Sequence, residues 1–309
     1  MSDHPRQLRM YLPEPLCHSA RAGEHNFLGL IADVVQQAGY SLEFIDRETA
    51  SMQQASREPG YSLFHMEEPF STRSVTIRRA YFYPFWHLER TGKRWQFDVA
   101  NTPFPASSSD HPDIARFFRF WQKRQFGDAP AQTRKEGFVL MPLQGRLLEK
   151  RSFQFCSPVR MVFETLEQVA DKPVIATLHP NETYSEKEIA TLEKLEAQSS
   201  NFQVRVGGSE QLLKGCDYVV TQNSAVAFSG LFFEKPCILF AASDFHHIAA
   251  NVAETGIERA FEMILAHQPD YGTYVHWFLQ EMCINAGRPE AADKIRTRLT
   301  KAGWPMDKK

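Results

Sequence analysis

Hydrophobic positions in the first 65 residues alternate between the spacing of strands and that of a helix. Three short apolar runs, 8–12, 41–45 and 61–65, predict strands. Between the first two, apolar residues recur at steps of three and four over residues 27–38, which predicts an amphipathic helix that ends at Gly39. A strand, a helix and a strand in this order are typical of a doubly wound α/β lobe.

The pattern is less regular from residue 74 to the end of this lobe. Aromatic residues crowd positions 74–97 without a clear period. Aromatic stretches are more often core than surface, so we expect core here, with a ligand-facing surface as the alternative. Residues 113–126 predict a helix, and the polar residues 127–135, which include Pro130, predict a linker. The first lobe is therefore expected to span residues 1–135.

Strands and helices alternate more regularly after residue 135. Five apolar runs predict strands at 137–143, 173–178, 202–206, 218–221 and 237–240. Helices are predicted between them, including one that Ser185 and Glu188 begin as a capping box and another capped by Ser209. This pattern predicts a second Rossmann-like lobe with a five-stranded parallel sheet over residues 136–265.

The remaining residues, 266–309, are expected to form C-terminal helices that brace the lobes. A membrane-facing helix is the alternative, and the few basic residues near the end do not decide between them. The predicted fold class is thus α/β with two Rossmann-like lobes, of the type called GT-B, and a C-terminal helical segment.

Composition and charge narrow the functional class. A chain of 309 residues suits two domains, and a formal net charge of −2 without basic runs argues against nucleic acid as a partner. No apolar run approaches the ~20 residues of a membrane span, and no secretion signal is present, so we expect a cytoplasmic protein. The five widely spaced cysteines are expected to be reduced and mostly buried. We expect no metal, because the side chains of adjacent His246 and His247 diverge.

Three predicted strands of the second lobe end in polar residues, at the edge where open parallel sheets bind ligands. These candidate residues are Gln144 and Glu149, His179 and Pro180, and Asn223 and Ser224. The last pair opens a helix, where free backbone N–H groups suit a phosphate. Structural alternatives stay open: a helix cap for Asn223 or Ser224, a loop residue for His179, and a solvated charged face for Glu149.

At these residues the chain resembles the capsule polysaccharide biosynthesis family, the bacterial β-Kdo transferases, which are related in structure to bacterial sialyltransferases. The similar segments lie within residues 137–252. They are a strand that leads to Gln144, a strand that ends in His179-Pro180, and a strand that leads into Asn223-Ser224 before Lys235-Pro236. The family usually has a lysine at the position of Thr177, and a glutamate in the helix where Phe228, Ser229 and Gly230 stand here.

The resemblance implies a glycosyltransferase that takes a CMP-activated ulosonic acid, such as CMP-Kdo, as donor substrate and uses neither a cofactor nor a metal. It implies that Gln144, His179, Pro180, Asn223 and Ser224 bind this donor in the second lobe. His179 would also stabilise the leaving phosphate, and Glu149 would assist proton transfer at the acceptor hydroxyl. The acceptor, a surface polysaccharide or glycolipid, would meet the first lobe.

Two other functions stay open. A nucleotide-sugar epimerase or hydrolase of similar architecture would use the same strand ends without an acceptor. A non-catalytic partner that binds a nucleotide-sugar fits the departures at Thr177 and Phe228. Peripheral association with the inner membrane, or with other polysaccharide-assembly proteins, is compatible with the resemblance as well.

Overall fold

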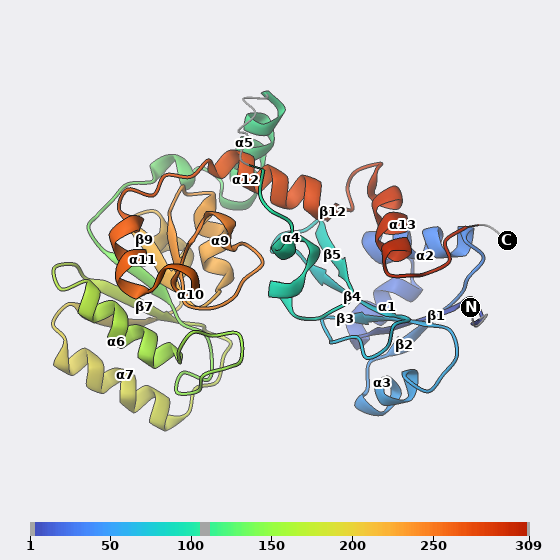
Figure 1. Cartoon of the computed structure of the whole chain (residues 1–309), viewed down its shortest axis with the longest axis horizontal. Coiled ribbons are helices and arrows are strands. Elements are labelled where there is room, and N and C mark those ends of the chain that lie inside the picture. The colour runs from blue at the N-terminus through green and yellow to red at the C-terminus, as the bar shows by residue number, and fades with distance from the viewer. Residues whose placement is uncertain (1–3, 106–111, 308–309) are drawn as a thin grey trace. The chain divides into compact units, whose positions relative to one another are not determined.

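The chain forms two compact units, each built on a six-stranded sheet. The computed structural model describes residues 4–105 and 112–307 (Figure 1). Unit 1 comprises Met1–Thr102 and Trp277–Lys309, and unit 2 comprises Pro103–His276. These bounds differ from the predicted domain boundaries after residues 135 and 265, because helix α5 (Pro112–Phe126) packs with unit 2 and the chain from Trp277 onward returns to unit 1.

The sheet of unit 1 has the strand order β12-β5-β4-β3-β1-β2. Its strands are β1 (Gln7–Leu12), β2 (Ser41–Asp46), β3 (Tyr61–His65), β4 (Ser74–Arg79), β5 (Phe85–Glu89) and β12 (Ile284–Asn285). Strands β1 to β4 are parallel to one another, whereas β5 pairs antiparallel with both β4 and β12. The carboxyl ends of β1 to β4 therefore share one edge of the sheet.

Helices cover both faces of this sheet. They are α1 (Glu14–Arg21), α2 (Asn26–Gln37), α3 (Thr49–Ala55), α4 (Asp98–Asn101), α13 (Ala291–Lys301), a 3-10 turn (Arg94–Gln96) and a π-helical turn (Trp277–Met282). Figure 1 shows α2 and α13 on one face, where they share a core with α1, while α3 packs on the other. Helix α2 buries Phe27, Ile31 and Val35, and Gly39 follows it with φ of 81°, as predicted. Helices α1 and α3 were not predicted.

Unit 2 has a parallel sheet in the order β11-β10-β9-β6-β7-β8. Its strands are β6 (Val139–Pro142), β7 (Val174–Leu178), β8 (Phe202–Val206), β9 (Tyr218–Thr221), β10 (Cys237–Leu239) and β11 (Ala250–Asn251). The five predicted strands are confirmed. The predicted number was wrong by one, because β11 pairs with β10 through only two residues, too few to leave a pattern.

The helices of unit 2 also lie on both faces of its sheet. They are α5, α6 (Pro158–Gln168), α7 (Glu186–Gln198), α8 (Ser209–Leu213), α9 (Ala225–Leu231), α10 (Val252–Thr255), α11 (Ile257–Ile264), α12 (Tyr271–His276) and 3-10 turns at Pro130–Gln132 and His246–Ile248. Helices α6, α7 and α11 share one core cluster, and Gly230 brings α9 against Val219 on the opposite face. The Ser185–Glu188 capping box is confirmed. Ser209 is instead the first residue of α8, with Gly208 as the cap.

Burial confirms part of the core expected in the aromatic stretch, where Phe85, Trp86 and Phe97 are buried, whereas Tyr83 is exposed. Four of the five cysteines are buried and all five are free thiols. The C-terminal residues 266–309 were predicted to form helices. The structure interrupts these helices with β12, because Ile284 and Asn285 pair with β5. In the described ranges no helix is long and apolar enough to cross a membrane.

Lys235 is a buried cation that joins three segments of unit 2. Its side chain is 2% exposed, and its Nζ donates to the carbonyl oxygens of Arg134 at 2.7 Å and Cys216 at 2.5 Å. Burial lowers the pKa of Lys235. The lysine of the Lys-Pro pair therefore ties the segment before β6 and the start of β9 to the turn after α9.

We expect Lys235→Met to lower the free energy of unfolding by about 3 kcal/mol, because it leaves two buried carbonyl groups without a donor. Urea denaturation followed by circular dichroism measures this change. The control is Lys187→Met on the exposed surface of α7, which should change stability by less than about 0.5 kcal/mol. Equal effects of the two substitutions would contradict a structural role for Lys235.

Candidate functional site

The three predicted polar strand ends lie next to one another in unit 2. Strand β6 pairs with β7 on one side and β9 on the other, all in parallel. The loops after these strands therefore leave the same edge of the sheet. A direct contact joins two of them, because the backbone N–H of Asn223 lies 3.4 Å from Gln144 Oε1. Thr221 Oγ1 also donates to the carbonyl of Pro142, at 2.8 Å, and holds the ends of β9 and β6 together.

His179 presents one ring nitrogen from this edge. The residue is exposed, as is Pro180 after it. The backbone N–H of Asn181 donates to His179 Nδ1 at 3.2 Å, and a backbone N–H can only donate. The neutral ring must therefore carry its proton on Nε2, which makes Nε2–H a hydrogen-bond donor. Nothing among the described residues is bonded to this atom. A second bond, from His179 N to the Tyr184 hydroxyl at 3.0 Å, fixes the backbone.

Asn223 and Ser224 are buried and already serve the fold. The Ser224 hydroxyl accepts a hydrogen bond from Val226 N at 3.3 Å, so Ser224 is the N-cap of α9. The Asn223 amide donates to the carbonyl of Ala242 at 2.9 Å and joins the loop after β9 to the end of β10. The helix-cap alternative is thus confirmed for Ser224. A phosphate contact of Asn223 or Ser224 stays a prediction.

Two carboxylates lie in the loops of this edge. Glu149 is exposed, and its nearest ion-pair partner is Arg146 at 3.7 Å. Glu182 was not singled out from the sequence. Its backbone N–H donates to the carbonyl of His179 at 3.2 Å, and a Cβ atom built on Gly145 would stand 2.6 Å from Glu182 Oε2. The turn from His179 thus places the Glu182 carboxylate against the loop after β6. Its position three residues after His179 was the only signal in the sequence.

Arg151 is a second residue that sequence reasoning missed. Its guanidinium stacks on the Phe153 ring at 4.9 Å, and its Nε and Nη2 atoms are buried without a partner among the described residues. Burial, followed by the charge of Arg146, lowers the pKa of Arg151. The segment that carries it lies across the end of β10, since Phe155 N donates to the carbonyl of Phe240 at 2.7 Å. Arg151 is therefore a partly desolvated cation at the same edge.

The two departures from the family pattern are packing residues in this structure. Thr177 is 2% exposed and shares a 2.8 Å hydrogen bond with the hydroxyl of Ser209. Phe228 is fully buried, with ring contacts to Phe232 and Phe245. Neither position offers a charged group to a ligand.

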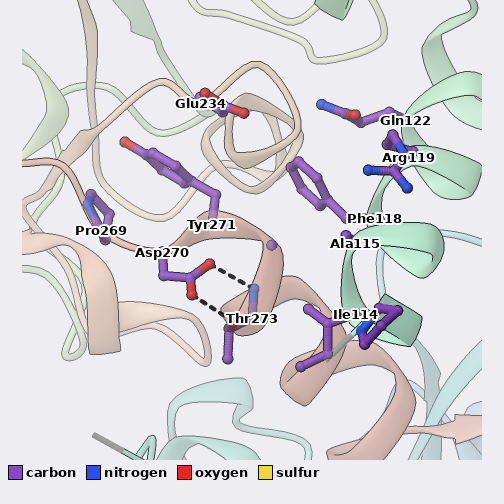
Figure 2. Close-up of a pocket in the computed structure, with 12 residues that line it drawn as sticks. Ile114, Ala115, Phe118, Arg119, Gln122, Glu234, Pro269, Asp270, Tyr271 and Thr273 are labelled. Atoms are coloured by element: carbon purple, nitrogen blue, oxygen red, sulfur yellow. Dashed lines mark hydrogen bonds between the residues drawn. The ribbon is translucent and has the colours of Figure 1, made fainter. Parts of the chain in front are cut away.

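A separate hollow of about 520 Å³ lies between α5 and the start of α12. Figure 2 shows Ile114 and Phe118 of α5 on one side and Asp270, Tyr271 and Thr273 on the other. The Asp270 carboxylate accepts from Thr273 N at 2.9 Å and from Thr273 Oγ1 at 2.6 Å, as the cap of α12. Glu234 precedes β10, so the hollow is near the amino edge of the sheet. The Asp270 carboxylate, which lines the hollow, is already used by the cap.

Two sheets rich in parallel strands, each flanked by helices, define the two-lobed α/β class called GT-B. No protein-family model matches the chain, and no curated protein matches it. Among solved structures, it is similar to the β-Kdo 2,7 transferase of KpsC from Thermosulfurimonas dismutans, with a TM-score of 0.56 at 9% identity over 96% of this chain and 99% of that one. This likeness confirms the predicted fold class.

Two further solved structures are less similar. The β-Kdo 2,4 transferase of KpsC from the same organism gives a TM-score of 0.45 at 11% identity, over 88% of this chain and 89% of that one. A co-structure of MnaA from S. aureus with UDP gives 0.40 at 10% identity, over 98% and 99%.

We expect Ser224→Ala to lower the free energy of unfolding by about 1 kcal/mol, because it removes the N-cap of α9. Ser224→Asn should keep most of the stability, since asparagine caps helices as well as serine does. Urea denaturation of both variants measures the difference. A loss in Ser224→Asn as large as that in Ser224→Ala would contradict the capping role.

Proposed function

We propose that the protein transfers Kdo or a related ulosonic acid from a CMP-activated donor to a surface polysaccharide or glycolipid. The observation that carries the proposal is the Nε2–H of His179, held as a donor by the bond from Asn181 to Nδ1. It lies at the carboxyl edge of a parallel sheet, where such folds bind ligands. The GT-B fold and the Kdo transferase named for the similar structure support the choice of reaction.

In this proposal His179 acts on the leaving group. The bond between the anomeric carbon and the phosphate oxygen of CMP breaks, and its electron pair stays on that oxygen. The Nε2–H of His179 donates a hydrogen bond to the phosphate, which stabilises the added negative charge as CMP leaves. Arg151 supplies a positive charge at the same edge. A single phosphate served by these two side chains needs no metal, so metal independence is part of the proposal.

The acceptor hydroxyl oxygen forms the new bond to the anomeric carbon, and its proton passes to a carboxylate that acts as general base. We assign this role to Glu149, the candidate that the resemblance offers, whose side chain is exposed. Glu182 is the rival, since its carboxylate lies against Gly145 at the same edge. The acceptor would bind to unit 1, on the cytoplasmic side of the inner membrane.

One observation favours a second candidate function, a protein that binds a nucleotide-sugar without turnover. Thr177 stands where the family usually has a lysine, and the segment 228–230 stands where it usually has a glutamate. Thr177 and Phe228 are packing residues here. A binding protein needs the phosphate donor at His179 but no catalytic base. Measurement of turnover separates the two functions.

We expect CMP to bind in the presence of EDTA, and His179→Ala to weaken this binding at least tenfold, or about 1.4 kcal/mol. Isothermal titration with CMP, UDP and GDP measures affinity and nucleotide preference together. His179→Gln should recover part of the affinity, because its amide nitrogen reaches the position of Nε2, whereas the shorter side chain in His179→Asn should not.

Preference for UDP or GDP would move the assignment to another class of nucleotide-sugar enzyme. Binding that depends on added Mg²⁺ would overturn the metal-free proposal. Equal affinities of the parent protein and His179→Ala would remove His179 from the donor site.

We expect Glu149→Gln to lower kcat for acceptor-dependent release of CMP by about a hundredfold without weakening CMP binding, because it removes the general base. Glu182→Gln is the matched comparison. A large loss in Glu182→Gln alone would move the base to Glu182. Release of CMP without an acceptor would favour a hydrolase, and binding without any release would favour the non-catalytic function.

A further inference from the structure

Basic residues gather at the carboxyl edge of the sheet in unit 1. Strands β3 and β4 end at His65 and at Arg78 and Arg79, and β2 is followed directly by Arg47. After β1 the chain continues through α1 to His25, which caps the next helix, α2. All four strands are parallel, so these residues share one edge. This is the edge at which an α/β sheet binds its ligand.

Side-chain contacts place several of these groups on one face. Arg79 pairs with Trp86 across the antiparallel strands β4 and β5, so both side chains point to the same face. Trp86 is 5% exposed, and the His25 ring meets its indole edge to face, with centroids 5.5 Å apart. This is the face covered by α2, because Phe27 of α2 stacks on the indole at 4.8 Å.

His65 lies on the same face, two residues after Leu63, which belongs to the core beneath α2. Burial, followed by the charges of Arg47, Arg78 and Arg79 and by His25, lowers the pKa of His65 to about 4. His65 is therefore neutral at pH 7 and able to donate through one ring nitrogen. Arg47, Arg78 and Arg79 therefore lie close enough to His65 to affect its charge state.

Three of the acidic residues near this edge are already engaged, whereas Glu14 and Glu24 are exposed to solvent. Glu67 pairs with Arg47 at 2.9 Å, Asp46 with Arg21 at 3.8 Å, and Glu68 accepts a hydrogen bond from Gly92 N at 2.6 Å. Arg79 is exposed, and no ion pair or hydrogen bond of its side chain occurs among the described residues. A guanidinium in this position is available for an anion from solution.

Two ring nitrogens on the same face of the sheet are buried in the fold. Trp86 Nε1 and His65 Nδ1 are buried without a hydrogen-bond partner among the described residues. A buried polar atom without a partner costs about 1–3 kcal/mol, so such atoms in a native fold call for an explanation. A ligand bound at this edge, with a small shift of the rings, supplies the acceptor that the chain lacks.

We propose that this edge of unit 1 binds an oxyanion, the carboxylate or phosphate monoester of an acidic saccharide, with Arg79 as its main charged contact and His65 and His25 beside it. Arginine suits both groups, because its planar fork of N–H donors matches two oxygens at once. This inference rests on the proposed function, because it takes the ligand of this edge to be the acceptor, which would then be acidic. Neutral saccharides lack the group that it recognises.

The test is isothermal titration with N-acetylneuraminate as the carboxylate probe, glucose 6-phosphate as the phosphate probe and glucose as the neutral one. The protein is saturated with CMP, so that the donor site of unit 2 is filled. We expect one acidic probe to bind, glucose not to bind, and Arg79→Gln to weaken binding at least tenfold. His65→Gln should weaken it to a smaller extent.

The matched control is Arg57→Gln, because Arg57 is also an exposed arginine of unit 1 but precedes β3 and so lies at the opposite edge. This variant should bind as the parent does. Equal weakening in Arg79→Gln and Arg57→Gln would show attraction by general charge and overturn the site. Absence of binding by both acidic probes up to about 10 mM, a Kd that corresponds to under 3 kcal/mol, would overturn it as well.

CMP binding, measured in parallel, separates this site from the proposed function. Arg79→Gln should keep the parent's affinity for CMP, and His179→Ala should keep the parent's affinity for the acidic probe. If CMP does not bind at all, the donor site fails, while the comparison of Arg79→Gln with Arg57→Gln still decides the oxyanion site. Thermal unfolding of each variant confirms that it is folded.

Discussion

The hydrogen bonds that hold β6 between β7 and β9 determine what unit 2 can offer a ligand. In a parallel sheet the carboxyl ends of all strands lie at the same edge. Strand pairing alone therefore brings Gln144, His179 and Asn223 together, although they are far apart in the chain. Some of these groups already form hydrogen bonds within the fold. Asn223 and Ser224 close loops and cap α9, while the Nε2–H of His179 stays available.

The same constraint acts in unit 1 with different residues. There Arg47 follows β2 and Arg79 ends β4, whereas the edge of unit 2 combines an imidazole, amides and one partly desolvated arginine. The difference suits two ligands of different kinds. A group whose charge grows during a reaction is stabilised by donors already fixed in place, such as Nε2–H of His179. A group that carries a permanent charge does not need a donor that acts at one step of a reaction. An exposed arginine such as Arg79 would suit it.

Local patterns in the sequence were enough for most of the fold. Five strands of unit 2, the Ser185 capping box and Gly39 all depend on neighbours in the chain, and each was predicted. Strands β11 and β12 have two residues each, which is too short for a period, and their pairing is decided by tertiary contacts. The return of the chain to unit 1 after Trp277 leaves no local mark either, so the compact units have other bounds than those predicted.

For the same reason, the sequence indicated some of the candidate site and left out the rest. His179 was found because it follows a legible strand, but the contact of Glu182 with Gly145 joins two loops, and the burial of Arg151 depends on the segment that crosses β10. Arg151 also bears on the lysine that the similar family usually has at the position of Thr177. Since Thr177 is bonded to Ser209 and brings no charge, the positive charge that a bound phosphate requires has to come from elsewhere on this edge. In the proposed donor site Arg151 would meet that requirement, because charges interact more strongly where water is partly excluded.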